Sequence, residues 1–135
     1  MFVQDIKYYS DEESLIPKED DCADVCVSDG NMKLLAFMHP AGNLQIGQEL
    51  SVLFSLDYDD LQQINNDEEE YYIRPNCYYY GYDVIGTVVS NDSGLIKVFN
   101  FLIKLGRIPD DIQTGDWIKV SITRLDVYAQ SIVKK

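Results

Sequence analysis

The chain has 135 residues, of which 46% are hydrophobic, and a formal net charge of −12 at pH 7. This length is typical of one domain, and no apolar run reaches the ~18 residues that a membrane-spanning helix needs. The acidic balance disfavours a nucleic-acid ligand, because Lys and Arg provide most of the affinity for a phosphate backbone.

The cysteines Cys22, Cys26 and Cys77 are odd in number, whereas a disulfide framework in a secreted protein usually has an even number. Free cysteines tend to be buried, so we expect three reduced, buried thiols. The first residues, MFVQDIKYYSDEE, lack the basic and apolar regions of a signal peptide. We therefore expect a cytoplasmic protein.

In chain order, the first predicted unit is a partly irregular N-terminal segment, residues 1–21, which includes the loop-like stretch SDEESLIPKEDD. A β core is predicted over residues 22–128. At its start, the apolar runs CADVCVS and MKLLAFM flank Asp-Gly-Asn, which is a strong hairpin signal. QELSVLFSL then places an apolar residue at every second position, as a strand does. Residues 129–135 are expected to be a tail of the same single domain.

The middle of the chain predicts one helix and one long strand. Asp57 is a suitable N-cap for a short helix through Leu61 and Ile64, which lie three residues apart. Farther on, CYYYGYDVIGTVVS, residues 77–90, predicts a strand in which two glycines mark bends.

The last third of the chain predicts further strands separated by a connector. LIKVFNFLIKL, residues 95–105, has polar residues that change phase, which predicts a bulge near residues 98–100. After the turn-rich connector GRIPDDIQTGD, the segment WIKVSITRLDVY again has apolar residues at alternate positions. Together these segments predict an all-β fold, a small barrel or sandwich of about 6–8 antiparallel strands with at most one or two short helices; an OB-like barrel is one version.

Two segments of the chain share a pattern. NLQIGQELSVLFSLDY and DIQTGDWIKVSITRLDVY each contain an apolar residue, Gln, one further residue and Gly, followed by alternating apolar positions and Leu-Asp. The hairpins upstream, VSDGNMKLLAF and VSNDSGLIKVF, also correspond loosely. An internal duplication explains this pattern, but so does the ordinary appearance of two hairpin-plus-loop units, and both readings remain open.

The residue types that usually carry catalysis form no recognisable motif. His39 is the single histidine, and Cys22, Cys26 and His39 lack a fourth ligand for a zinc site. The chain contains no phosphate-binding loop, Rossmann glycine pattern or nucleophile elbow. We therefore expect no enzymatic activity, no cofactor and no metal.

The negative charge is concentrated in the first half of the chain. Residues 1–73 contain 17 acids and 3 bases, a net charge of −14, whereas residues 74–135 contain 6 acids and 8 bases, a net charge of +2. Acids beside tyrosines suit a basic protein partner, because Tyr provides contact area and carboxylates bind Lys and Arg. The candidate partner-binding residues are Asp59, Asp60, Asp67, Glu68, Glu69, Glu70, Tyr71 and Tyr72. A second candidate patch comprises Asp11, Glu12, Glu13, Glu19, Asp20 and Asp21.

The segments AFMHPAGNLQIGQ and IPDDIQTGDWIKVSITRLDVY contain a set of short turn and strand motifs. These motifs are His39-Pro40, Gly47, Pro109, Asp111-Ile112, Gly115-Asp116 and Arg124-Leu125-Asp126. In this set the chain resembles a group of small acidic bacterial β-proteins, which in turn resembles the cytoplasmic immunity proteins of bacterial toxin systems. The resemblance implies a protein that binds and neutralises a basic toxin domain, such as a nuclease, and that has no catalytic residues.

Two other functions remain open from the sequence. An OB-like module that binds single-stranded nucleic acid or an oligosaccharide would use tyrosines as stacking platforms. For nucleic acid it needs a basic groove, for which the chain offers Arg74, Lys97, Lys104, Arg107, Lys119 and Arg124. A small enzyme or sugar-binding domain would need a deep pocket lined by Tyr and Asp. The oligomeric state is not defined by the sequence.

Overall fold

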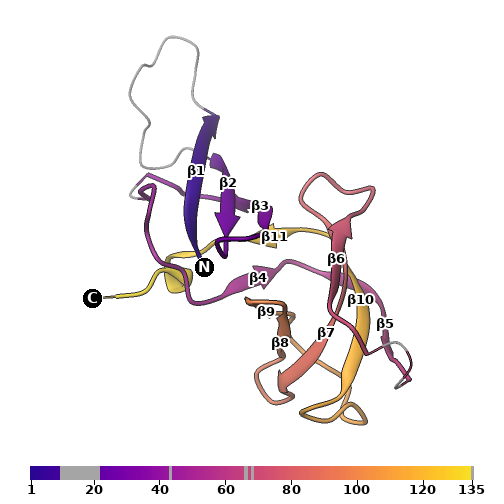
Figure 1. Ribbon diagram of the computed structural model, residues 1–135. Coiled ribbons are helices and arrows are strands. Elements are labelled where there is room, and N and C mark those ends of the chain that lie inside the picture. Colours follow the sequence, from indigo (N-terminus) through magenta and orange to yellow (C-terminus); the bar gives the residue numbers. More distant parts are fainter. Residues whose placement is uncertain (10–21, 43, 66, 68, 135) are drawn as a thin grey trace.

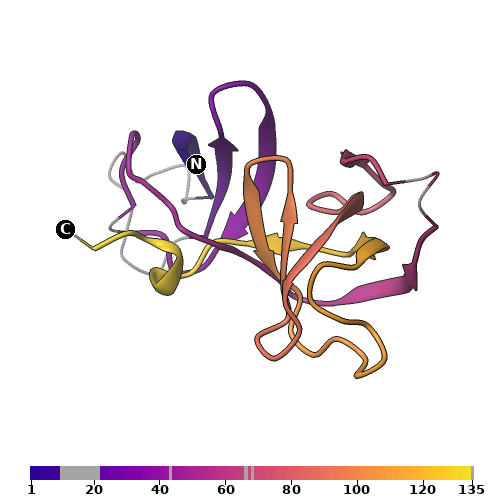
Figure 2. The ribbon, with the colours of Figure 1, turned by 60° about the horizontal axis from the view of Figure 1, so that its bottom comes forward.

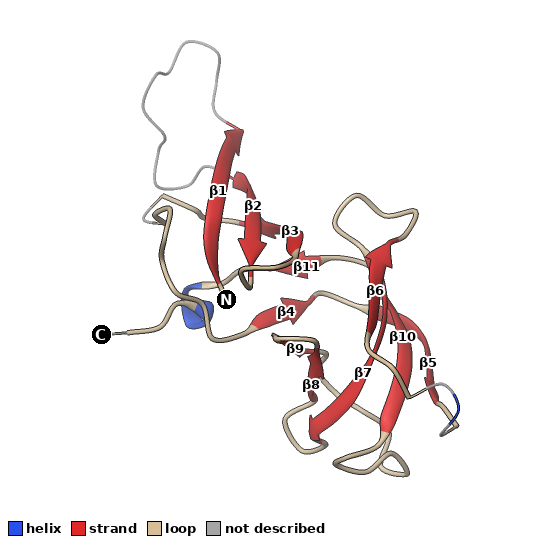
Figure 3. Cartoon of the chain, viewed as in Figure 1, coloured by secondary structure: helices blue, strands red, loops and turns tan. Residues whose placement is uncertain are grey.

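The computed structural model describes residues 1–9, 22–42, 44–65, 67 and 69–134. In these residues, eleven strands belong to one hydrogen-bonded sheet (Figure 1), which confirms the all-β prediction. The strands are β1 (Phe2–Tyr9), β2 (Cys22–Ser28), β3 (Lys33–Met38), β4 (Leu53–Ser55), β5 (Tyr58–Gln63), β6 (Tyr72–Pro75), β7 (Tyr82–Ser90), β8 (Leu95–Val98), β9 (Phe101–Lys104), β10 (Trp117–Ile122) and β11 (Leu125–Asp126). Helical structure is limited to short turns, of which the 3-10 helix η2 (Ala129–Ser131) follows β11 (Figure 3).

The number of strands and the closure of the sheet differ from the prediction. The sheet has eleven strands, and its order β1-β2-β3-β11-β4-β9-β8-β7-β10-β5 has two end strands, so it is not a closed barrel. β6 pairs with β7 outside this path. Two pairs, β3 with β11 and β4 with β9, are parallel. β4 and β11 have only three and two residues, and strands this short show no periodicity in a sequence.

Eight strands of this order, from β1 to β7, are arranged symmetrically about the pair β11 and β4, and β10 and β5 follow at one end. The series β1-β2-β3-β11 corresponds to the series β7-β8-β9-β4, and β11 pairs antiparallel with β4 in the middle. Each half therefore has three consecutive antiparallel strands and a later strand that crosses over and pairs in parallel with the third strand of the other half. Figure 1 and Figure 2 show β1, β2 and β3 on one side of the crossing strands and β7, β8 and β10 on the other.

The loops that follow the third strands have matching hydrogen bonds. Gly47 N donates to a carbonyl of β1 at 2.7 Å, and Gly115 N donates to a carbonyl of β7 at 2.8 Å. Both glycines have left-handed φ angles, +89° and +93°, which Gly adopts without the steric cost of a side chain. Leu44 and Ile112, each three residues before its glycine, are both buried. The two similar segments of the sequence therefore occupy equivalent places in the fold.

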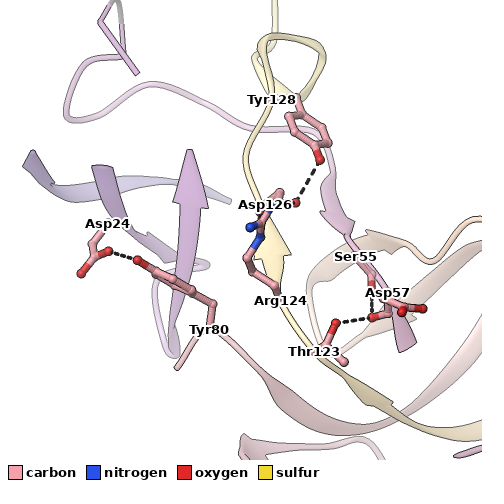
Figure 4. Close-up of polar contacts among 8 residues, drawn as sticks. All are labelled: Asp24, Ser55, Asp57, Tyr80, Thr123, Arg124, Asp126 and Tyr128. Atoms are coloured by element: carbon pink, nitrogen blue, oxygen red, sulfur yellow. Dashed lines mark hydrogen bonds and ion pairs between the residues drawn. The ribbon is translucent and has the colours of Figure 1, made fainter. Parts of the chain in front are cut away.

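The two crossing segments are hydrogen-bonded to each other near the centre of the sheet. Leu56 N donates to Arg124 O at 3.0 Å, and Thr123 N donates to Asp57 O at 3.1 Å. The hydroxyl groups of Ser55 and Thr123 also donate to Asp57 O (Figure 4). This reciprocal pairing fixes the point at which the chain passes from one half to the other.

One core of buried hydrophobic side chains extends through both halves. Val25 and Ala36 from the first half, Ile96 and Phe101 from the second, and Leu53 from a crossing strand are fully buried. Burial of a large apolar side chain contributes about 1.5–3 kcal/mol. Both halves therefore contribute side chains to the same core.

Three local predictions are wrong. The helix expected after Asp57 is β5, because pairing with β10 provides backbone hydrogen bonds that outweigh one cap and two apolar residues. Residues 77–90 do not form one strand, since residues 77–80 make a turn before β7 begins. The phase change at residues 98–100 is the hairpin turn between β8 and β9, not a bulge. Phe99 has a φ of +53° there, which is rare for a side chain of this size and gives no sequence signal.

The expectations for the N-terminal segment, residues 1–21, and for the three cysteines are also wrong in part. β1 is a regular strand within the segment expected to be partly irregular, and the rest of that segment, residues 10–21, lies outside the described residues. The three cysteines are free, but none is buried: Cys22 and Cys26 are half-exposed and Cys77 is exposed. Cys22 is the first residue of β2, Cys26 occupies an outward position of the same strand, and Cys77 lies in the turn after β6.

Candidate partner-binding face

Four adjacent strands, β6, β7, β10 and β5, present one face to solvent. Along β7 and β10 every second side chain is buried, for example Val84 and Val120, which lie opposite each other. The alternate side chains point the other way, and the cross-strand register aligns them in rows. We call this side the outer face. Its residues are Asp59, Gln62, Tyr72, Arg74, Asp83, Ile85, Thr87, Trp117, Lys119 and Ser121.

Tyr71 holds the end of the predicted acidic segment against the outer face. Its ring centroid lies 4.9 Å from that of Trp117 and 5.6 Å from that of Phe99. Its hydroxyl lies 3.4 Å from Thr87 Oγ1, and Lys97 Nζ lies 6.0 Å from its ring centroid. These contacts fix the half-buried ring of Tyr71, and Glu70, the residue before it, is therefore kept near the sheet.

A first hollow on the outer face combines apolar surface with charge. It is lined by Asp67, Glu70, Tyr71, Tyr72, Ile85 and Lys119. Ile85 and the two tyrosine rings provide the apolar surface, and the two acids and the lysine are exposed. An apolar centre with a charged surround is the usual composition of a protein-binding hot spot.

A second hollow adjoins the first along the same strands, since β6, β7 and β10 each contribute residues to both. It is lined by Asp59, Asp60, Arg74, Pro75, Asn76, Cys77, Tyr78, Asp83 and Ser121. Asp83 accepts hydrogen bonds from Ser121 Oγ at 2.8 Å and from Asn76 Nδ2 at 3.3 Å. These bonds hold the Asp83 carboxylate in place, so this hollow is also lined by fixed negative charge.

Most of the predicted partner-binding residues come together on this side of the molecule. The first hollow contains Asp67, Glu70, Tyr71 and Tyr72. The second hollow contains Asp59 and Asp60. Glu69 is exposed, and Glu68 lies outside the described residues. The second predicted patch, which comprises Asp11, Glu12, Glu13, Glu19, Asp20 and Asp21, also lies outside them.

Ile85, Trp117 and Lys119 belong to this surface but were not among the predicted site residues. The alternation of buried residues in β7 and β10 is a signal that these side chains point away from the core. What the sequence does not show is the pairing of β6 with β7, which places Tyr72 opposite Ile85. That pairing joins the acidic segment to the sheet.

The basic residues considered for a nucleic-acid groove do not all lie together: Lys97, near the Tyr71 ring, accompanies Arg74 and Lys119 on the outer face, and the other three lie elsewhere. Lys104 and Arg107 line a different hollow, together with two aspartates. Arg124 forms an ion pair with Asp126, its Nε 2.7 Å from Oδ1 (Figure 4). On the outer face, Lys119 and Arg74 each line a hollow that also contains carboxylates. These carboxylates repel a phosphate backbone.

Three other tyrosines of the Tyr-rich segment, Tyr79, Tyr80 and Tyr82, connect the two halves. The carboxylate of Asp24, which is only 6% exposed, accepts hydrogen bonds from the hydroxyls of Tyr9, Tyr79 and Tyr80 (Figure 4 shows Tyr80). Burial and the bond to Asp24 raise the pKa of Tyr80 above its usual range. The buried Tyr82 hydroxyl accepts a hydrogen bond from a backbone N–H of β3 at 2.7 Å. These tyrosines therefore have a structural role.

Within the part of the chain that the structure describes, no helix is long and apolar enough to cross a membrane. The same residues include no group of three or more His, Cys, Asp or Glu side chains arranged to hold a metal ion. Comparisons of the chain with protein-family models, with curated proteins and with solved structures find no match.

Proposed function

We propose that the protein binds a basic protein partner through the outer face and acts as a cytoplasmic immunity protein that neutralises a bacterial toxin domain. The observation that carries this proposal is the first hollow, in which Asp67 and Glu70 border the apolar surface of Tyr72 and Ile85. A Lys or Arg side chain suits such a hollow, since its hydrocarbon stem covers apolar surface while its charged end reaches a carboxylate.

The charges of the outer face support a basic partner. Arg124 and Asp126 form the one ion pair among the described residues. Asp67, Glu70 and Asp59 of this face therefore have no cation of the described residues within ion-pair distance. Unpaired carboxylates on a chain with a net charge of −12 create a negative field. Such a field speeds the encounter with a basic partner and disfavours acidic ones.

The aromatic residues support binding energy as well as steering. Tyr72, Tyr71 and Trp117 lie close together on this face, and residues of these types are enriched among those that dominate interface energies. A basic nuclease is a suitable toxin, because its phosphate-binding cleft would match the acidic rim. No catalytic step is needed for such a protein to act.

The alternative is an OB-like module that stacks bases or sugars on the same aromatic side chains. The carboxylates in both hollows oppose a nucleic acid there. Fluorescence anisotropy with a labelled single-stranded oligonucleotide at low salt separates the two functions. Saturable binding that is lost on replacement of Tyr72 and Trp117 by Ala would favour the alternative.

The immunity function predicts that a reading frame next to this gene encodes a basic domain, and that domain is the partner to use in a binding test. The double variant Asp67→Lys with Glu70→Lys reverses the charge of the first hollow. Its matched control is Asp92→Lys with Asp110→Lys, which makes the same change of charge in a different hollow. We expect the first variant to weaken binding in isothermal titration by at least about 30-fold, or about 2 kcal/mol, and to lose protection of cells that express the domain.

The control variant should retain affinity within about 3-fold, since distant charges act mainly on the association rate. Equal losses in the two variants would show that only net charge matters, and the outer face would then not be the site. No binding between the unmodified protein and the basic domain would reject the immunity function.

A further inference from the structure

A thiol and an imidazole meet on the first half of the molecule. Cys22 is the first residue of β2, and His39 directly follows β3. Because Ala23 lies opposite Met38 in this antiparallel pair, the two side chains come together beside the ends of the strands. Cys22 Sγ lies 2.9 Å from His39 Nδ1, with the cysteine half-exposed and the histidine exposed.

The other two cysteines have different surroundings and serve as internal references. Cys26 points outward from the middle of β2, and burial raises the pKa of its thiol. Cys77 is exposed in the turn after β6, and its thiol has no hydrogen-bond partner among the described residues. Within the described part of the chain, only the thiol of Cys22 is hydrogen-bonded to a group that can take up its proton.

We propose that Cys22 is a reactive thiol activated by His39 and a site of mixed-disulfide formation with low-molecular-weight disulfides. A hydrogen-bonded imidazole accepts the thiol proton and leaves a thiolate, the form of cysteine that acts as a nucleophile. No side chain of the described residues is bonded to the second ring nitrogen of His39. Among the described residues the pair thus has no orienting third group like that of a cysteine hydrolase, and thiol–disulfide exchange is the reaction that it supports.

The reaction is a simple exchange in which atoms and electrons balance. The Cys22 thiolate attacks one sulfur of the small disulfide, a new S–S bond forms, and the original S–S bond breaks. The departing half leaves as a thiolate and takes up the proton that His39 held. Cys22 is oxidised, and one half of the disulfide is reduced to a thiol. The disulfide itself is the oxidant.

This site is separate from the outer face. Cys22 and His39 belong to the β2–β3 hairpin of the first half, whereas the outer face is built from β5, β6, β7 and β10 of the opposite side (Figure 1). Modification of Cys22 therefore leaves the proposed binding hollows unchanged, and the two proposals fail or succeed independently.

The test uses the full chain with oxidised glutathione at pH 7, and the rate at each cysteine is measured by peptide mass mapping. An ordinary exposed thiol is only about 3% ionised at this pH. Because a thiolate becomes a weaker nucleophile as its pKa falls, the largest net gain in rate from ionisation is about 3-fold. We expect Cys22 to react about 3-fold faster than Cys77. A Cys22 rate equal to or below that of Cys77 would overturn the proposal, and this comparison needs no variant.

The variant His39→Gln removes the base. It should lower the Cys22 rate by about 3-fold, to about the Cys77 rate, while the Cys77 rate in the same sample stays constant. An unchanged Cys22 rate in this variant would also overturn the proposal. In urea, where the contact between the two side chains is lost, the three cysteines of the unmodified protein should react at similar rates. If Cys22 still reacts faster than the other two cysteines in urea, the local sequence, and not His39, causes its reactivity.

Discussion

The two halves of the molecule share a strand arrangement but differ in what is added to it. In each half, three antiparallel strands precede a loop with a positive-φ glycine and a strand that crosses to the other half. After the first crossing, the chain continues through β5 and β6, which pair with β10 and β7 of the second half. After the second crossing, the described chain makes only η2 and a single bridge. We call the chain between β4 and β7, which contains β5 and β6, the linker. The linker adds strands to the second half alone and so completes the candidate binding face there.

A second difference concerns the strand that follows each glycine loop. In the second half, β10 stays beside β7 along six residue pairs. In the first half, the equivalent chain meets β1 at the isolated bridge between Phe2 and Glu49, and Leu50 already pairs with Ile132. The outer face needs several adjacent strands, and only the longer pairing in the second half provides them. The same arrangement therefore supports a broad face on one side alone.

The largest expected effect separates the turns of the two halves. In the β7–β8 turn, a Cβ on Gly94 would lie 1.5 Å from the carbonyl oxygen of Gly106. In the β2–β3 turn, Gly30 also has a positive φ, but nothing lies within 4 Å of its Cβ position. Gly94→Ala should cost more than about 4 kcal/mol and Gly30→Ala about 1 kcal/mol in urea denaturation. Equal costs would mean that the close approach to Gly106 does not exist.

The next effect tests the equivalence of the halves directly. Leu44 and Ile112 are 4% and 5% exposed and occupy matching places before the two glycine loops. Leu44→Ala and Ile112→Ala should each lower the free energy of unfolding by about 2–5 kcal/mol. If the halves are equivalent, urea denaturation should give two values within about 1 kcal/mol of each other. A much smaller loss at Leu44 would show that the first loop contributes little to the core.

A smaller effect concerns the contact between the halves at Asp24. Tyr80→Phe removes one hydroxyl bonded to this buried carboxylate and should cost about 1 kcal/mol at pH 8. Since burial and Asp24 raise the pKa of Tyr80 above 10.0, its stabilising contribution is complete below pH 10 and is lost as the pH rises above it.

Urea denaturation at pH 8 and at pH 11 measures this dependence. Tyr80→Phe should lose less stability than the unmodified protein between these two pH values. Some dependence should remain, because burial also raises the pKa of Tyr82 and of Tyr128. A variant with the same pH dependence as the unmodified protein would exclude Tyr80 as a titrating contact between the halves.

The smallest expected effect is on the stability of the variant designed to block binding. Asp67 and Glu70 are exposed and belong to the linker that only the second half carries. Asp67→Lys with Glu70→Lys should change the free energy of unfolding by no more than about 0.5 kcal/mol per site. A large destabilisation would show that the linker acids support the fold, so the comparison of binding with the control variant would lose its meaning.

The sequence predicted part of the candidate site because exposed acids and tyrosines are visible as composition. It did not separate the tyrosines by role. Tyr71 and Tyr72 line a hollow of the outer face, whereas Tyr80 and Tyr82 bond to groups of β2 and β3. Alternation along a single strand cannot make this distinction. The partners of Tyr80 and Tyr82 come from strands that lie about 50 residues away in the chain.

The sequence by itself determined the all-β class, because period-2 alternation and turn residues are local properties. It also determined that the segment around Glu69 and Glu70 faces water, since unpaired carboxylates are too costly to bury. The symmetric strand order, the two parallel crossings and the pairing of β6 with β7 were decided only in the tertiary structure. The physical reason is that backbone hydrogen bonds between strands are nearly alike for all residue types, so the choice among pairings depends on which distant side chains then share one core.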